Sequence, residues 1–141
     1  MTVAAFVNPS CEEVCARLKQ VRRIAVVGLS PNPSRPSHGV ARALQAYGFE
    51  IVPVRPKVSE VLGAKAYARL ADVPGRIDLV DVFRAPEYIP DIVAQCIAIG
   101  APALWLQEGI VHEEAAHRAR AAGLWVVMDR CLYRDYAGWC R

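Results

Sequence analysis

Short apolar runs alternate along this chain with segments that have helical spacing. Five of these runs, rich in Val, Ile and Leu, predict β-strands because they lack the regular polar alternation of half-exposed strands. They cover Ile24–Val27, Glu50–Val54, Asp78–Phe83, Ala103–Leu106 and Leu124–Met128. Strands of this composition are expected in a parallel sheet that is covered on both faces.

Helical segments precede the first strand and separate most of the others. The predicted helices cover Ser10–Gln20, Ser37–Tyr47, Pro86–Ile99 and Val111–Ala122. Ser10 and Glu13 have the spacing of a capping box at a helix start. The stretch from Ser59 to Gly75 is irregular, with short turns of helix expected at Ser59–Leu62 and near Ala68–Asp72.

The alternation of strands and helices predicts an α/β fold. We expect residues 1–141 to form one three-layer, Rossmann-like domain with a five-stranded parallel sheet in the order 3-2-1-4-5. Ligands of such sheets bind beyond the carboxyl ends of the strands, near the point where the strand order reverses. The residues that follow each strand are therefore the candidates for a binding site.

Composition narrows the possible functions. The chain is 54% hydrophobic and 22% charged, and its net charge of +3 is not gathered into a block that would indicate nucleic-acid binding. No apolar run is long enough to span a membrane, and the segment from Met1 to Val7 lacks the basic start of a signal peptide. Five cysteines without a repeated spacing predict reduced thiols in the cytoplasm and no metal site.

The loop after the first strand is the strongest functional signal. It begins at Gly28, contains three prolines and leads into a predicted helix, an arrangement that binds phosphates through backbone amides and the helix dipole. Arg35 is suited to bidentate contact with a phosphate, and serine hydroxyls add further donors. The candidate binding residues in this loop are Gly28, Leu29, Ser30, Ser34, Arg35 and Ser37, of which Ser37 is also suited to cap the helix.

The second strand is followed by two cations, Arg55 and Lys57. A domain that binds NAD would place an acidic residue near this strand end, to bond the ribose 2′-hydroxyl. Cations favour instead a nucleotide with an additional ribose phosphate. NADP and coenzyme A (CoA) both fit this requirement.

The remaining strand ends add further candidates. Phe83 ends the third strand and Arg84 follows it, and Gln107 and Gly109 follow the fourth. Cys131, after the fifth strand, is either a reactive thiol or a packed small side chain. Asp78 and Asp81 are interpreted as structural, and we identify no catalytic or metal-binding set.

The segments at these strand ends together resemble the small stand-alone CoA-binding domain proteins of bacteria, a family similar to the N-terminal domain of the succinyl-CoA synthetase α subunit. The resemblance rests on Ile24–Ser30 with Pro33–Ser37, Pro53–Lys57, Asp81–Arg84, Trp105–Gly109 and Val127–Cys131. It implies that the first loop holds the CoA pyrophosphate and that Arg55 and Lys57 lie at the adenosine end, with Val54 beside them in the sequence as a further candidate binding residue. It also implies that Val82, Phe83 and Arg84 line the groove.

These observations lead to one hypothesis and two alternatives. The hypothesis is a cytoplasmic protein that binds CoA or an acyl-CoA without catalysis of its own, and with neither nucleic acid nor membrane as a partner. The first alternative is an NADP-dependent oxidoreductase. The second is a redox regulator in which CoA reversibly caps a thiol such as Cys131.

Overall fold

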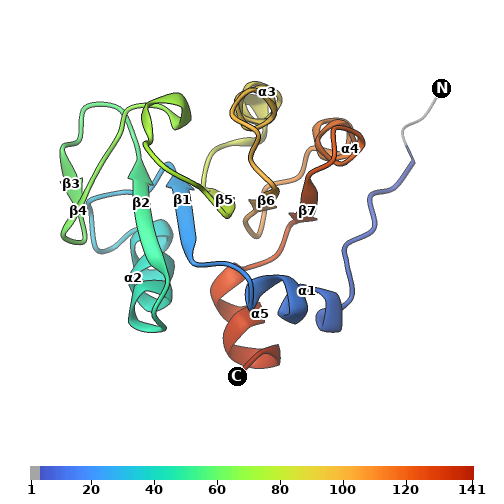
Figure 1. Ribbon diagram of the computed structural model, residues 1–141, viewed down its shortest axis with the longest axis horizontal. Coiled ribbons are helices and arrows are strands. Elements are labelled where there is room, and N and C mark those ends of the chain that lie inside the picture. The colour runs from blue at the N-terminus through green and yellow to red at the C-terminus, as the bar shows by residue number, and fades with distance from the viewer. Residues whose placement is uncertain (1–3) are drawn as a thin grey trace.

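A five-stranded parallel sheet forms the centre of the fold, and helices cover both of its faces (Figure 1). The computed structural model describes residues 4–141, so Met1–Val3 lie outside the described residues. The strands are β1 (Arg23–Val27), β2 (Glu50–Val54), β3 (Glu60–Val61), β4 (Ala64–Lys65), β5 (Leu79–Val82), β6 (Ala103–Leu106) and β7 (Trp125–Met128). The α-helices are α1 (Cys11–Leu18), α2 (Pro36–Ala46), α3 (Ile89–Ala98), α4 (Glu113–Ala121) and α5 (Leu132–Trp139), with 3₁₀ turns at η1 (Leu70–Asp72) and η2 (Pro86–Tyr88).

The strands of the main sheet lie in the order β2-β1-β5-β6-β7. Tyr67 adds one parallel bridge to Val54, on the side of β2 away from β1. When the segment at Tyr67 is counted as the third strand in sequence, the sheet follows the expected 3-2-1-4-5 order. Strand β5, which is the third of the five predicted strands, lies beside β1 and not at the sheet edge. The order reverses between β1 and β5.

Alternate side chains of each strand enter two separate cores. On β1, Ile24 and Val26 pack towards α1, α2 and α5, whereas Ala25 and Val27 pack towards α3 and α4. All four side chains are at most 9% exposed. Burial on both faces explains why the strand sequences lack polar alternation. The predicted three-layer α/β architecture is thus confirmed.

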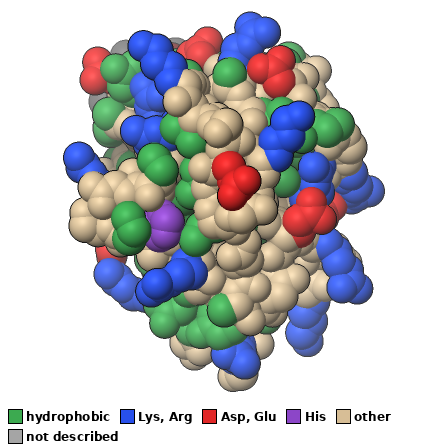
Figure 2. All heavy atoms as spheres, turned by 90° about the vertical axis from the view of Figure 1, so that its left-hand side faces the viewer, with side chains coloured by type: hydrophobic (Ala, Val, Ile, Leu, Met, Phe, Trp, Pro, Cys, Tyr) green, Lys and Arg blue, Asp and Glu red, His purple; other side chains and the backbone are tan. Residues whose placement is uncertain are grey.

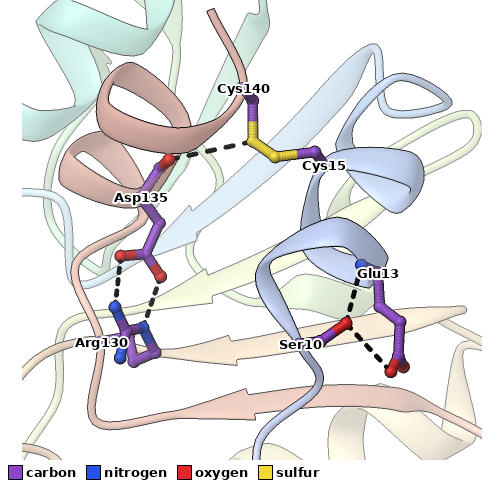
Figure 3. Close-up of a disulfide and its surroundings, with 6 residues drawn as sticks. All are labelled: Ser10, Glu13, Cys15, Arg130, Asp135 and Cys140. Atoms are coloured by element: carbon purple, nitrogen blue, oxygen red, sulfur yellow. Dashed lines mark hydrogen bonds and ion pairs between the residues drawn. A yellow bond between two sulfur atoms is a disulfide. The ribbon is translucent and has the colours of Figure 1, made fainter.

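The predicted helices are present, with ends that shift by a few residues. Helix α1 begins after Ser10, whose hydroxyl accepts a hydrogen bond from the Glu13 amide at 3.2 Å (Figure 3). The predicted helix over residues 86–99 divides into the 3₁₀ turn η2 and helix α3. Within residues 4–141, no helix combines the length and the apolar composition needed to cross a membrane.

The irregular stretch contains a small hairpin where a helical turn was expected. β3 and β4 pair antiparallel, and Leu62 and Gly63 connect them with φ values of 55° and 75°. Two successive positive φ values are typical of the tight turn that joins hairpin strands. The expected turn of helix at Ser59–Leu62 is therefore wrong, whereas the one near residues 68–72 is present as η1.

The C-terminal segment folds as helix α5, which was not among the predicted helices. A disulfide joins Cys15 of α1 to Cys140, directly after α5 (Figure 3). The expectation that all five cysteines are reduced is wrong for this pair, because the fold brings together two residues 125 positions apart in the sequence. A disulfide that closes so long a loop stabilises a fold by roughly 2–5 kcal/mol.

Two aspartates of the third predicted strand occupy opposite electrostatic environments. Burial raises the pKa of Asp78, but the hydrogen bonds from the Arg23 and Arg22 amides and from the Arg76 guanidinium together outweigh this effect, so that the net shift is downward. Asp81 lies at the middle of the sheet, paired with Val26 and Trp105. Neither of its carboxyl oxygens has a well-formed hydrogen bond among the described residues. Burial raises the pKa of Asp81 well above its ordinary value, and the nearby Val82 amide offsets only part of this effect.

We predict that Asp81→Asn increases the free energy of unfolding, and that the increase grows with pH. The folded protein keeps the Asp81 proton, whereas the unfolded chain releases it above about pH 4. Wild-type stability therefore falls as the pH rises from that value towards the folded-state pKa. Urea denaturation at a series of pH values from about 4 to 8 measures the difference.

Asp78→Asn is the matched control, and its expected change in the free energy of unfolding has the opposite sign. Because the folded-state pKa of Asp78 is lowered, its contribution to stability is present above the unfolded pKa and is lost on acidification. This variant should be less stable than the wild type at neutral pH and approach it in acid. A constant offset for Asp81→Asn across the pH series would contradict the assignment of a raised pKa.

Candidate functional site

A cleft of about 1000 Å³ opens at the carboxyl ends of β1, β2, β5 and β6, where the strand order reverses. Nine of the 14 residues predicted from the sequence border it. These are Gly28, Ser30, Arg35, Ser37, Arg55, Phe83, Arg84, Gln107 and Gly109. The rule that ligands bind at the carboxyl ends of parallel strands therefore identified residues of one cleft that lie up to 81 positions apart in the sequence.

Five predicted residues do not border the cleft. The side chains of Leu29, Val54 and Val82 are at most 4% exposed and belong to the two cores. Ser34 and Lys57 are exposed outside the cleft. The Ser34 hydroxyl donates to Asn32 Oδ1 at 2.9 Å, which engages the donor that the sequence assigned to a phosphate.

Gly28 shapes the base of the cleft. Its φ is +85°, and a Cβ atom at this position would lie 2.4 Å from the carbonyl oxygen of Phe83. Only glycine fits both the left-handed conformation and this close approach of two backbones. The Gly28 amide donates to the Val54 carbonyl at 2.9 Å, and its carbonyl accepts from Arg55 at 3.3 Å. Gly28 thus ties the ends of β1, β2 and β5 together.

The loop after Gly28 is ordered by its own side chains. The Ser30 amide donates to the Ser37 hydroxyl at 3.0 Å, and the Asn32 amide donates to the Ser30 hydroxyl at 3.1 Å. Ser37 is therefore not the helix cap. Arg35 is the N-cap residue of α2, and Pro36 occupies the first helical position. The positive end of the α2 dipole faces the loop.

Cations dominate the border of the cleft. Arg35, Arg55, Arg84 and Arg134 border it, and Glu108 is the acidic residue among its described lining. Figure 2, which views the molecule from the side of β2 and the hairpin, shows Lys and Arg spread over this face with fewer Asp and Glu. The Arg35 side chain forms no hydrogen bond or ion pair with residues 4–141. It is free to contact an anion.

The other three arginines have partners. Arg84 lies over the Tyr88 ring, 4.1 Å from its centroid, and Arg134 pairs with Glu108 at 2.9 Å. Arg55 donates to the Gly28 carbonyl. The Arg134–Glu108 pair is largely exposed and contributes little to stability. These contacts position the guanidinium groups at the border without neutralising Arg55 or Arg84.

Sequence reasoning missed Arg134 because it missed α5. The spacing of Leu132, Tyr136 and Trp139 is helical and would have indicated the element. Cys131, which follows the fifth predicted strand, does border the cleft. Among the described residues, no group of three His, Cys, Asp or Glu side chains is arranged to hold a metal ion.

The sequence matches a known protein family over most of its length. The family, described as CoA binding domain, matches residues 22–137. The chain belongs to the CoA-binding domain family. An uncharacterized protein of Bacillus subtilis (strain 168), YneT, is 44% identical to it over 125 residues, which cover 89% of this chain and 93% of that protein.

Two further relatives extend the comparison of this CoA-binding domain. The solved structure of a hypothetical protein from Pyrococcus horikoshii OT3 has 34% sequence identity and a TM-score of 0.92, and it covers 100% of both chains. The α subunit of the ADP-forming acetate–CoA ligase II of Pyrococcus furiosus is 32% identical over 76 residues. That match covers 53% of this chain but only 17% of the subunit.

We predict that Gly28→Ala destabilises this CoA-binding domain by at least about 1–2 kcal/mol, because an alanine is strained at this φ and its Cβ meets the Phe83 carbonyl oxygen. Gly39→Ala is the control. Gly39 lies inside α2, and a Cβ atom added there would meet no atom within 4 Å, so alanine should stabilise the helix by up to about 1 kcal/mol. Urea denaturation distinguishes the two. Equal effects would show that the contact at Gly28 is not tight.

Proposed function

We propose that this protein binds CoA or an acyl-CoA in the cleft and has no catalytic activity of its own. The observation that carries the proposal is the position of the unpaired Arg35 at the start of α2, in a cleft bordered by four arginines and one glutamate. Phosphate groups are the ligands suited to a helix N-terminus with a free guanidinium. The family match and the relationship to a CoA ligase subunit support CoA as the phosphorylated ligand.

The cleft offers a place for each part of CoA. Arg35 and the loop from Ser30 to Ser37 are suited to the pyrophosphate. Arg55, at the end of β2, is suited to the 3′-phosphate of the ribose. The pantetheine arm would then follow Phe83 and Gln107 towards Cys131, because these residues border the remaining length of the cleft.

The positions of the two aspartates of the third predicted strand also support a binding role. Asp78 lies at the amino end of β5, where it accepts hydrogen bonds from two backbone amides and pairs with Arg76 at 2.7 Å. Asp81 is fully buried within the sheet. Neither borders the cleft, which supports the structural interpretation of both. We propose the cytoplasm as the compartment, and the Cys15–Cys140 disulfide is the observation that opposes it.

We predict that Arg35→Ala weakens CoA binding at least about tenfold, because a hydrogen bond to a charged group contributes roughly 1.5–3 kcal/mol. Arg35 is exposed and packs against no core, so the melting temperature should change little. Arg35→Lys should restore part of the affinity, since lysine keeps the charge but not the bidentate geometry. Isothermal titration calorimetry with CoA measures all three proteins.

Arg42→Ala is the control for this experiment. Arg42 lies on α2, the helix that follows Arg35, but it does not border the cleft, so the variant removes the same charge without removing a proposed contact. If Arg35→Ala and Arg42→Ala weakened binding equally, only the net charge would matter and the proposed clamp would be excluded. Absence of any CoA binding by the wild type would refute the proposed function itself.

We predict that the wild type binds CoA more tightly than 3′-dephospho-CoA, by about tenfold to 150-fold if Arg55 forms a charge-assisted hydrogen bond with the phosphate. Arg55→Ala should remove this preference and leave the affinity for dephospho-CoA nearly unchanged. Lys57→Ala serves as the comparison, because Lys57 is exposed outside the cleft. If Lys57→Ala removed the preference for CoA and Arg55→Ala did not, the assignment of the 3′-phosphate to Arg55 would be wrong.

A further inference from the structure

One free thiol borders the cleft. Cys131 is 8% exposed, lies directly before α5 and forms no disulfide. It lines the same cleft as Arg35, at the end of a different strand. The proposed path of the pantetheine arm ends beside it, so that a bound CoA would bring its own sulfur close to a protein sulfur.

Gln107 independently indicates a ligand at this end of the cleft. Its side chain is 4% exposed, and its Oε1 accepts a hydrogen bond from the Leu132 amide at 3.2 Å. The amide group therefore lies against the backbone that directly follows Cys131. No residue within 4–141 accepts a hydrogen bond from Nε2 of Gln107, and the residue borders the cleft. Nε2 is not among the fully buried atoms that lack a partner, so this donor is accessible from the cleft and available to a ligand carbonyl.

We propose that Cys131 is a site of reversible modification by CoA, formed by thiol–disulfide exchange with a CoA disulfide bound in the cleft. This inference rests on the proposed function, because the nucleotide must first bind. A carbonyl of the pantetheine arm would accept a hydrogen bond from Nε2 of Gln107. This contact would hold the adjoining part of the arm beside Cys131. In the modified protein, the covalently attached CoA would occupy the cleft.

The exchange balances without a further reactant. The Cys131 thiolate attacks one sulfur of the CoA disulfide, and the Sγ–S bond to CoA forms as the original S–S bond breaks. The second CoA leaves as a thiolate and takes up the proton that Cys131 released. Cys131 is oxidised, and the CoA disulfide is reduced to one free CoA and one protein-bound CoA.

The other two free cysteines provide internal controls. Cys11 is exposed at the start of α1 and does not border the cleft. Cys96 is buried in α3, where burial raises the pKa of its thiol to about 12. Reaction governed by exposure alone would therefore modify Cys11 first. Reaction directed by binding in the cleft would modify Cys131 first.

The test compares two disulfides on the wild-type protein. The protein is incubated with CoA disulfide or with glutathione disulfide, which lacks the nucleotide, and the adducts are mapped by mass spectrometry of non-reduced peptides. We expect CoA disulfide to modify Cys131 at least about tenfold faster than Cys11, because binding raises the local concentration of the reagent. Glutathione disulfide should show the reverse order.

Variants separate this inference from the proposed function. Arg35→Ala should slow the reaction at Cys131 and leave that at Cys11 unchanged, whereas Cys11→Ser should leave the Cys131 adduct intact. Modification of Cys11 as fast as Cys131 by CoA disulfide, or adducts at Cys15 or Cys140, would overturn the inference. Calorimetric binding of reduced CoA, together with the absence of a Cys131 adduct after incubation with CoA disulfide, would refute the modification alone. Absence of binding would refute the proposed function as well.

Discussion

The close approach of two backbones at Gly28 is the constraint on which the rest of the site depends. The end of β1 passes so near the Phe83 carbonyl that no side chain fits between them. From this point the chain turns into the loop before α2, while β5 continues towards η2 on the opposite face. The cleft opens because the two connections diverge there. Arg55 is held at the same place by the Gly28 carbonyl, so one position without a side chain organises three strand ends.

The cleft combines a rigid loop with an uncompensated charge. Serine and asparagine side chains of the loop bond backbone amides of the same loop, and prolines restrict its backbone. Such a loop loses little conformational entropy when a ligand binds. Among residues 4–141, Arg35 is the polar side chain of this loop that has no hydrogen-bond or ion-pair partner. The protein thus orders the backbone in advance and leaves the charge available.

Much of the fold and most of the candidate site could be predicted from local sequence, because parallel strands buried on both faces form continuous apolar runs. The residues that follow them then meet at one sheet edge. Leu29, Val54 and Val82 show the limit of this reasoning, since side chains near a strand end alternate between core and cleft. Helix α5, the Tyr67 bridge and the disulfide depend on tertiary packing between distant segments. No local pattern specifies which cysteine Cys15 meets.

The Cys15–Cys140 disulfide gives the chain the connectivity of a ring. Every residue that borders the cleft, from Gly28 to Arg134, lies inside this ring. A single cut of the backbone in any exposed loop between the two cysteines would leave one covalent molecule that still carries the whole cleft. Two covalent paths therefore connect the residues of the cleft, one along the peptide backbone and one through the disulfide.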